Sequence, residues 1–188
     1  EDALQRLEGT PFEAQARLAL LAIYERSRDW PHAATIARKM HAADQGDFST
    51  RQAHYLCEQA LALIAQGDLP GAQALLDQAV AAAPEAARAR IELARLQRLM
   101  GQPAAVLSTL KTLGERNPAA LPLAAPLMVE AATATGRTPE VHALLQTHYA
   151  QAPSLDVLES IVAMEAADEA TRSSARQRYV EHLDKERS

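Results

Sequence analysis

The sequence predicts an all-α protein built as a solenoid of antiparallel helix pairs. A unit of 34 residues recurs, because Gly67 and Gly101 lie 34 residues apart and so do Pro84 and Pro118; a third copy, one residue longer, ends at Pro153. Helical patterns alternate with short turns throughout, and no strand pattern is visible. A fixed period in the thirties with helical patterning is typical of stacked helix pairs. We expect about five pairs, of which the first and the last can be incomplete.

The prolines mark where these helices begin and end. Proline lacks a backbone N–H, so it fits the first turn of a helix or the residues just after one. Those in the first turn of a predicted second helix are Pro31, Pro70, Pro103 and Pro139, and those just after one are Pro84, Pro118 and Pro153. The chain 1–188 is therefore predicted to be one array, with repeats at roughly 12–45, 52–84, 86–118, 120–153 and 154–187.

The first repeat has a clear predicted start. Residues 1–8 place apolar side chains on one helical face, and we expect them to be the tail of a preceding second helix. Thr10, Pro11 and Glu13 then predict an N-cap, a first helical residue and a capping box. The helix that they open continues to about Ser27, and the next helix begins at Pro31.

The later helices follow the period, with two irregularities. Residues 41–51 add five residues to the period and predict a longer surface loop. Pro126 falls inside the first helix of the fourth repeat, where it costs about 3 kcal/mol, so we predict a kink or a frayed start there. The other predicted helices are Arg51–Gln66, Leu69–Ala83, Glu85–Met100, Pro103–Arg116, Pro139–Gln151, Leu155–Ala167 and, approximately, Glu169–Glu186.

Composition narrows the class of function. Hydrophobic residues make up 48% of the chain but aromatic residues only 4%, so alanine and leucine must form the core. The net charge of −5 argues against a nucleic-acid partner, since such proteins need a basic surface. One cysteine, Cys57, allows no internal disulfide and fits a reducing compartment. No apolar run approaches the length of a membrane span, residues 1–25 do not form a signal peptide, and Glu1 leads us to expect a fragment or a processed form.

The small and proline positions resemble the tetratricopeptide repeat family. The small residue of the first helix is Ala60 and Ala94, and the closing proline recurs as described above. The small residue of the second helix is Ala33 and Ala72 in two repeats and is replaced by Val106 and Val141 in two others. The resemblance covers essentially the whole chain and implies a right-handed superhelix. The fourth repeat departs most from the family pattern.

A narrower resemblance is to the lipopolysaccharide assembly protein B family. It is carried by Asp29-Trp30 followed by Ala33 and Ala37, by Ala53-His54-Tyr55-Leu56-Cys57-Glu58-Gln59-Ala60 after a longer loop, by Gly67-Asp68-Leu69 and by Pro153-Ser154-Leu155-Asp156. The resemblance implies an array at the cytoplasmic face of the inner membrane. It also implies that the anchor and a rubredoxin-like metal module belong to parts of the protein outside this chain.

Together the resemblances imply a non-catalytic scaffold with no cofactor in this chain and no direct insertion into the membrane. The partners implied are the lipid A deacetylase, a membrane protease that degrades it, or both, and the role implied is regulation of lipopolysaccharide synthesis. Two alternatives stay open at this point. The chain could be a homo-oligomerisation module, or the accessory repeat region of a larger enzyme such as a glycosyltransferase.

The family resemblance also implies where a partner would bind, because the first helix of each repeat lines the concave groove. The groove residues predicted on this basis are His54, Leu61, Arg88, Ile91, Arg95 and Arg98. The three arginines share one helical face by their spacing, and arginines can hold carboxylates through bidentate hydrogen bonds. We therefore predict that the groove holds an acidic segment of a partner protein. The alternative is a solvated helix face with local salt bridges.

Other chemistry-bearing residues form no catalytic or metal pattern. Cys57 and His54 supply at most two ligands, whereas a structural zinc site needs about four. We interpret Cys57 as a small buried packing residue and Trp30 as an apolar plug between helices rather than a platform for a ligand. The remaining histidines show no metal-binding spacing, and no paired carboxylates or phosphate-binding loop are evident.

Overall fold

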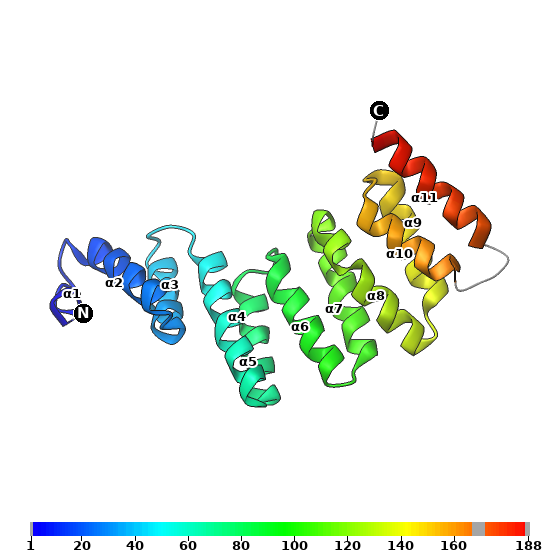
Figure 1. The fold of residues 1–188 in the computed structure, drawn as a ribbon. Coiled ribbons are helices and arrows are strands. Elements are labelled where there is room, and N and C mark those ends of the chain that lie inside the picture. Colours follow the sequence, from blue (N-terminus) through cyan, green and yellow to red (C-terminus); the bar gives the residue numbers. More distant parts are fainter. Residues whose placement is uncertain (1, 167–171, 187–188) are drawn as a thin grey trace. The chain divides into compact units, whose positions relative to one another are not determined.

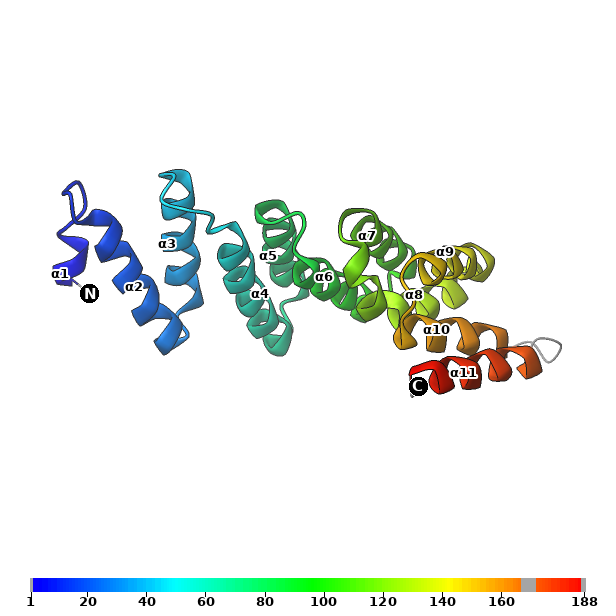
Figure 2. The ribbon, with the colours of Figure 1, turned by 90° about the horizontal axis from the view of Figure 1, so that it is seen from above.

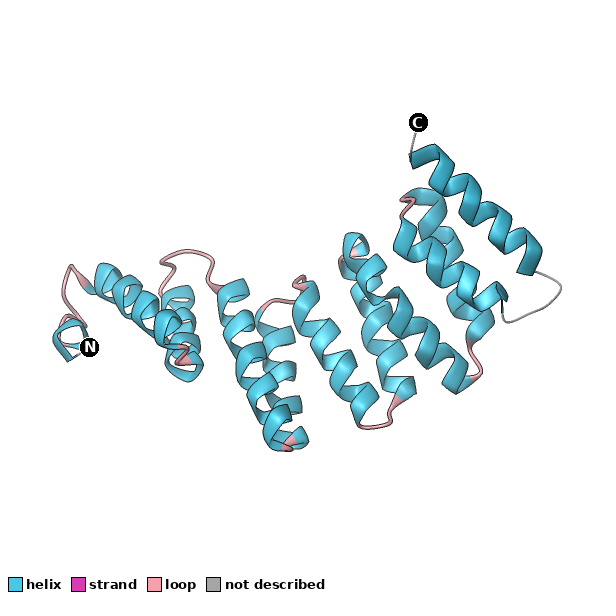
Figure 3. Ribbon diagram, viewed as in Figure 1, coloured by secondary structure: helices cyan, strands magenta, loops and turns pink. Residues whose placement is uncertain are grey.

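Helices are the only regular structure in residues 2–166 and 172–186, the parts of the chain that the computed structural model describes (Figure 3). The all-α prediction is confirmed. The predicted helix end at Ala167 and helix start at Glu169 lie outside the described residues. The chain divides into two compact units, residues 1–96 (unit 1) and 97–188 (unit 2), which are described separately. That residues 1–188 form one continuous array stays a prediction.

Unit 1 is a series of helices of which the first five pack in sequence, each on the next. Its helices are α1 (Asp2–Gln5), α2 (Glu13–Ser27), α3 (Trp30–Ala42), α4 (Ser49–Gln66), α5 (Leu69–Ala82) and most of α6 (Ala87–Leu99). Helix α2 packs on α3, α3 on α4, and α4 on α5, which runs beside it (Figures 1 and 2). Residues 43–48 between α3 and α4 are not helical, which agrees with the longer loop that was predicted in this region.

Unit 2 repeats this arrangement. It holds the end of α6, then α7 (Pro103–Arg116), a 3₁₀ turn η1 (Pro118–Ala120), α8 (Leu121–Thr135), α9 (Thr138–Gln151), α10 (Leu155–Ala166) and α11 (Arg172–Glu186). Helix α8 packs on α7, α9 and α10, and α10 packs on α9 and α11 (Figure 1). The first helix of one repeat thus contacts its own partner and the first helix of the next repeat, as in a solenoid.

The residues at the repeated small positions are fully buried. Ala60 and Ala94 have no exposed surface, and neither do Ala33 and Ala72. Where the fourth repeat departs from this pattern, Met128 stands 34 residues after Ala94 and is also fully buried. A small residue lets two helices approach closely, whereas methionine fills a wider gap with a flexible side chain. The fourth repeat therefore keeps a buried residue at the equivalent position but has a larger side chain there.

The recurring turns follow from local chemistry. Gly67 ends α4 with φ of 84° and Gly101 follows α6 with φ of 70°, a left-handed conformation that glycine adopts without steric cost. In the first repeat Arg28 takes this position with φ of 56°. An aspartate caps the next helix in two repeats: Asp29 accepts a hydrogen bond from the His32 N–H, and Asp68 accepts one from the Gly71 N–H.

The predicted capping box at the start of α2 is wrong. Helix α2 begins at Glu13, with Phe12 at the N-cap position and no side-chain cap. The Thr10 hydroxyl oxygen accepts from the Phe12 N–H at 3.3 Å, and the Glu13 carboxylate accepts from the Gly9 N–H at 2.7 Å. Both side chains bind turn residues that precede the helix, so Pro11 lies in the turn rather than in the first helical position.

Helix α8 accommodates Pro126 without a break. It continues as one α-helix from Leu121 to Thr135, with Pro126 as its sixth residue. The irregularity lies at its start, where η1 leads into the helix through a tighter turn. Because Pro126 has no N–H, it cannot donate to the carbonyl oxygen of Pro122 one turn earlier. The helix tolerates this loss near its N-terminal end.

Candidate functional site

The predicted groove residue Arg88 lies in unit 1 and joins α6 to α4. Its guanidinium donates to the Nδ1 atom of His54 and, at 2.5 Å, to the carboxylate of Glu58. The Arg88 side chain keeps 41% of its surface exposed and Glu58 keeps 26%. The structure thus brings Arg88 and His54 together, and the Glu58 carboxylate of the same chain already binds some of the N–H groups of the guanidinium.

The other two arginines also have carboxylate partners. Arg95, in unit 1, lies 2.8 Å from Glu92 one turn earlier on α6. Arg98, in unit 2, lies 3.4 Å from Glu130 on α8. Both arginine side chains are more than half exposed. Exposed ion pairs contribute about 0–1 kcal/mol, which applies to Arg98 and Glu130, since both side chains are more than half exposed. Glu92 is mostly buried, so Arg95 offers a partner only the part of its guanidinium that faces solvent.

The apolar members of the predicted groove contribute less surface. Ile91 is buried with 8% of its surface exposed, and Leu61 is half-buried. Cys57, on the same helix as His54, is 1% exposed, and burial raises the pKa of its thiol to about 11. A thiol with so high a pKa stays protonated at neutral pH and is a poor nucleophile. The surroundings of Cys57 are those of a packing residue.

A cluster of charged and aromatic side chains in unit 1 was not predicted. Glu25 of α2 accepts hydrogen bonds from the Tyr55 hydroxyl and, at 2.7 Å, from Arg51, both on α4. The Trp30 ring stacks on the Tyr55 ring with centroids 6.0 Å apart and meets the edge of the His54 ring. Trp30 therefore packs against α4. The cluster ties the first helices of two successive repeats together.

The Glu25 cluster predicts a pH dependence of stability. Burial raises the pKa of Glu25, but the hydrogen bonds from Tyr55 and Arg51 outweigh it, and the pKa lies below its ordinary value of 4.5. A depressed pKa stabilises the fold above the pKa of the unfolded chain, and this contribution is lost as the pH falls through the folded-state pKa. We expect Glu25→Gln to lower the free energy of unfolding by about 1 kcal/mol or less at pH 7. Urea unfolding at pH 7 and near pH 3 measures this difference, which should become smaller at the acidic pH; an equal difference at both would contradict the assignment.

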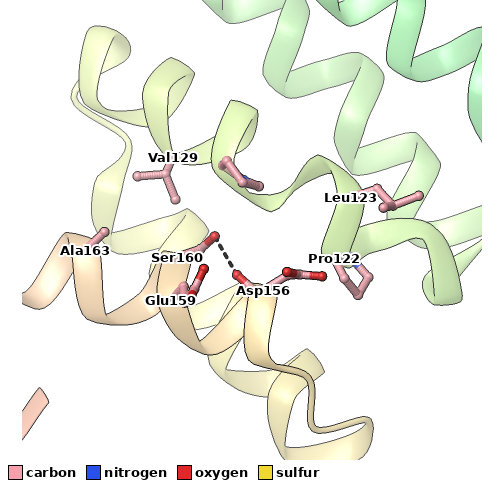
Figure 4. Close-up of a pocket in the computed structure, with 8 residues that line it drawn as sticks. Pro122, Leu123, Val129, Asp156, Glu159, Ser160 and Ala163 are labelled. Atoms are coloured by element: carbon pink, nitrogen blue, oxygen red, sulfur yellow. Dashed lines mark hydrogen bonds between the residues drawn. The ribbon is translucent and has the colours of Figure 1, made fainter. Parts of the chain in front are cut away.

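Unit 2 contains a groove between α8 and α10, the first helices of two successive repeats (Figure 4). Its volume is about 480 Å³. The side from α8 is apolar and the side from α10 carries two carboxylates. The lining residues are Pro122, Leu123, Pro126, Val129, Asp156, Glu159, Ser160 and Ala163. Figure 4 shows the Asp156, Glu159 and Ser160 side chains on the side of α10 that faces α8.

Residues 2–166 and 172–186 contain no group of three histidine, cysteine or acidic side chains that could hold a metal ion. None of their helices combines the length and the apolar character that crossing a membrane requires.

The comparison with family models gives a direct match. The tetratricopeptide repeat model matches residues 63–128, which include the end of α4, all of α5, α6 and α7, and the first half of α8. The sequence of residues 63–128 is thus similar to tetratricopeptide repeats. The 34-residue period, the buried small positions and the closing prolines of this segment are the features that the match reflects.

Known proteins resemble the chain beyond this segment. Lipopolysaccharide assembly protein B of Escherichia coli strain K12 is 30% identical over 112 residues, which are 59% of this chain and 29% of that protein. The chain thus spans under a third of the length of the curated relative. MamA from Desulfovibrio magneticus RS-1 superposes with a TM-score of 0.56 at 15% identity, covering 93% of this chain and 95% of that one. YrrB, titled a TPR protein with an unusual peptide-binding site, gives 0.52 at 14% identity, with 91% and 85% covered. These structures support the solenoid of helix pairs.

The tetratricopeptide repeat pattern explains which site residues the sequence could supply. It assigns positions along each first helix, and on that basis Arg88 and His54 were expected on the first helices of successive repeats; the structure has them on α6 and α4. It did not supply the carboxylates that pair with the arginines, nor the groove of unit 2. Asp156 and Glu159 are three residues apart and share a helical face, which is visible in the sequence. Their position opposite Pro126 follows only from the packing of α8 on α10.

Proposed function

We propose that the chain is a non-catalytic scaffold for protein–protein interaction that regulates lipopolysaccharide biosynthesis at the cytoplasmic face of the inner membrane. In this proposal it brings the lipid A deacetylase to a membrane protease, and neither step needs a cofactor in this chain. The observation that carries the proposal is the 30% identity to lipopolysaccharide assembly protein B. The solenoid by itself does not select a function, because unrelated activities share one fold.

The surface that we propose for the partner lies in unit 1, on α4 and α6. Arg88 and Arg95 are exposed there, and His54 is exposed beside Arg88. A partner's carboxylate can bind the solvent-facing N–H groups of either guanidinium while Glu58 and Glu92 stay paired, because a guanidinium has five N–H donors and both arginine side chains are exposed. A bidentate contact to a guanidinium is stronger than a single hydrogen bond. YrrB, a TPR protein with a peptide-binding site, gives a precedent for peptide binding by a protein of this fold.

A direct binding measurement tests the proposal. The 188-residue chain is immobilised on a biosensor and the purified lipid A deacetylase and membrane protease are passed over it in turn. We expect the deacetylase, the protease or both to bind. The variant Arg88→Ala/Arg95→Ala should bind about tenfold more weakly, which corresponds to ~1.4 kcal/mol.

The matched control removes two exposed arginines elsewhere in unit 1. Arg26→Ala/Arg38→Ala makes the same change in net charge on α2 and α3, and both side chains are exposed. It should bind like the wild type. If neither purified protein binds, the proposed function is rejected. If the two double variants lose equal affinity, the arginine surface is rejected and the scaffold function stays in place.

A further inference from the structure

The groove between α8 and α10 has an apolar side that is open to solvent. Leu123 keeps 68% of its surface exposed, and Pro126 beside it is also exposed. Pro122 and Val129 complete this side. Exposed apolar groups gathered in a concave surface are typical of binding sites, whereas scattered ones are ordinary.

The helix that carries this apolar side also offers a backbone acceptor. Pro126 has no N–H to give to the carbonyl oxygen of Pro122, and the two prolines lie one turn apart on the groove face of α8. A bound chain could donate an N–H to this oxygen. The one proline in the interior of α8 therefore lies on the face of the helix that lines the groove, and not on the face that packs in the core.

The charge of the groove is of one sign. Its lining includes Asp156 and Glu159 and no cation. Both carboxylates are exposed, and no ion pair joins either of them to another residue in the described parts of the chain. Glu159 accepts a hydrogen bond from the Tyr179 hydroxyl of α11 at 2.9 Å. Ser160 is not available, because it is buried and its hydroxyl donates to the Asp156 carbonyl oxygen at 2.9 Å.

We propose that this groove binds a short segment of a partner protein that carries lysine or arginine next to an apolar side chain. The cation would lie between Asp156 and Glu159, which share one face of α10 at a spacing of three residues. The apolar side chain would cover Leu123 and Pro126. The charge preference is opposite to that of the arginine surface in unit 1, so this is a second interaction surface, and it does not rest on the function proposed above.

Short synthetic peptides of matched composition test the proposal. Each has the same glycine–serine frame, a fluorescent label and a central segment of Leu-Lys-Leu-Lys, Leu-Glu-Leu-Glu or Ser-Lys-Ser-Lys. Fluorescence anisotropy with the 188-residue chain should show the tightest binding for the peptide that combines leucine with lysine. Its affinity should fall as salt is added, because exposed charges are screened. Equal binding of the lysine–leucine and glutamate–leucine peptides would overturn the proposal.

Charge-neutral variants locate the binding. Asp156→Asn/Glu159→Gln keeps the side-chain shapes and should weaken the lysine–leucine peptide about tenfold. The matched control Asp77→Asn/Glu115→Gln removes two exposed carboxylates from α5 and α7 and should leave the affinity unchanged. Equal weakening by both would mean that the peptide responds to overall charge, which overturns the groove assignment.

A third variant should increase the affinity. Tyr179→Phe removes the hydroxyl that binds Glu159 and keeps the ring. Glu159 is then free to pair with the lysine of the peptide, so we expect binding that is about twofold to fivefold tighter. This outcome cannot arise from loss of folding. A weaker or unchanged affinity would show that Glu159 does not contact the peptide.

Discussion

Replacing Leu110 with alanine is expected to lower the free energy of unfolding of unit 2 by about 2–5 kcal/mol. Leu110 lies on α7 and has no exposed surface, and the neighbouring Leu107 and Leu113 on the same helix are 1% exposed. Removing its side chain leaves a cavity that the surrounding helices can only partly fill. The loss of transfer energy and the cavity both act in the same direction.

The control for this prediction is the same substitution on an exposed site. Leu99, the last residue of α6, keeps 60% of its surface exposed, and Leu99→Ala should change stability by less than about 1 kcal/mol. Urea unfolding followed by circular dichroism measures both variants. Similar effects for Leu99→Ala and Leu110→Ala would show that α7 does not carry the core of unit 2.

The fold was predictable because each repeat uses local chemistry that is written in the sequence. Gly67 and Gly101 end first helices in a left-handed conformation, and Pro103 begins a second helix where its missing N–H costs nothing. Ala60 and Ala94 are buried because their helices approach closely. Each of these features depends on residues that are near in the chain or in the adjacent repeat, so the repeat period is enough to predict where it occurs.

The predictions that failed or fell short concern which of several possible hydrogen-bond or ion-pair partners a side chain takes. Thr10 and Glu13 have the residue types of a capping box, yet they bind N–H groups of the preceding turn. The arginines were placed on the right helix, but Arg88 pairs with Glu58, 30 residues away, and Arg98 pairs with Glu130, 32 residues away. Such pairs depend on the packing of one helix against another. The sequence supplies the charges and leaves their partners open.

The groove of unit 2 shows the same limit in a different form. Pro126 was recognised as costly for a helix, and the spacing of Asp156 and Glu159 was available. The repeat period places α8 and α10 in successive repeats, but it does not say which of their side chains face each other. The packing of these helices converts two separate local features into one surface. A residue that breaks a local rule is therefore worth testing for binding as well as for stability.

Pro126→Ala is the variant that separates these two effects, and we expect it to raise the free energy of unfolding by up to about 3 kcal/mol. Alanine restores the N–H that can bond to the carbonyl oxygen of Pro122 and removes the ring from the helix interior. Pro122→Ala is the matched control, because the second residue of α8 has an N–H without a helical partner and proline is tolerated there. Thermal and urea unfolding should show a large gain for the first variant and little change for the second.

The same substitution should weaken the binding of the lysine–leucine peptide, since it removes both an apolar contact and the acceptor that we assign to the groove. A gain in stability with a loss of binding is the pattern expected when a protein retains a destabilising residue for function. A gain in stability with unchanged binding would mean that Pro126 contributes neither an apolar contact nor a free backbone acceptor to the binding of the peptide. In that case the carboxylates of α10 and the exposed Leu123 would have to account for recognition without any contribution from the backbone of α8.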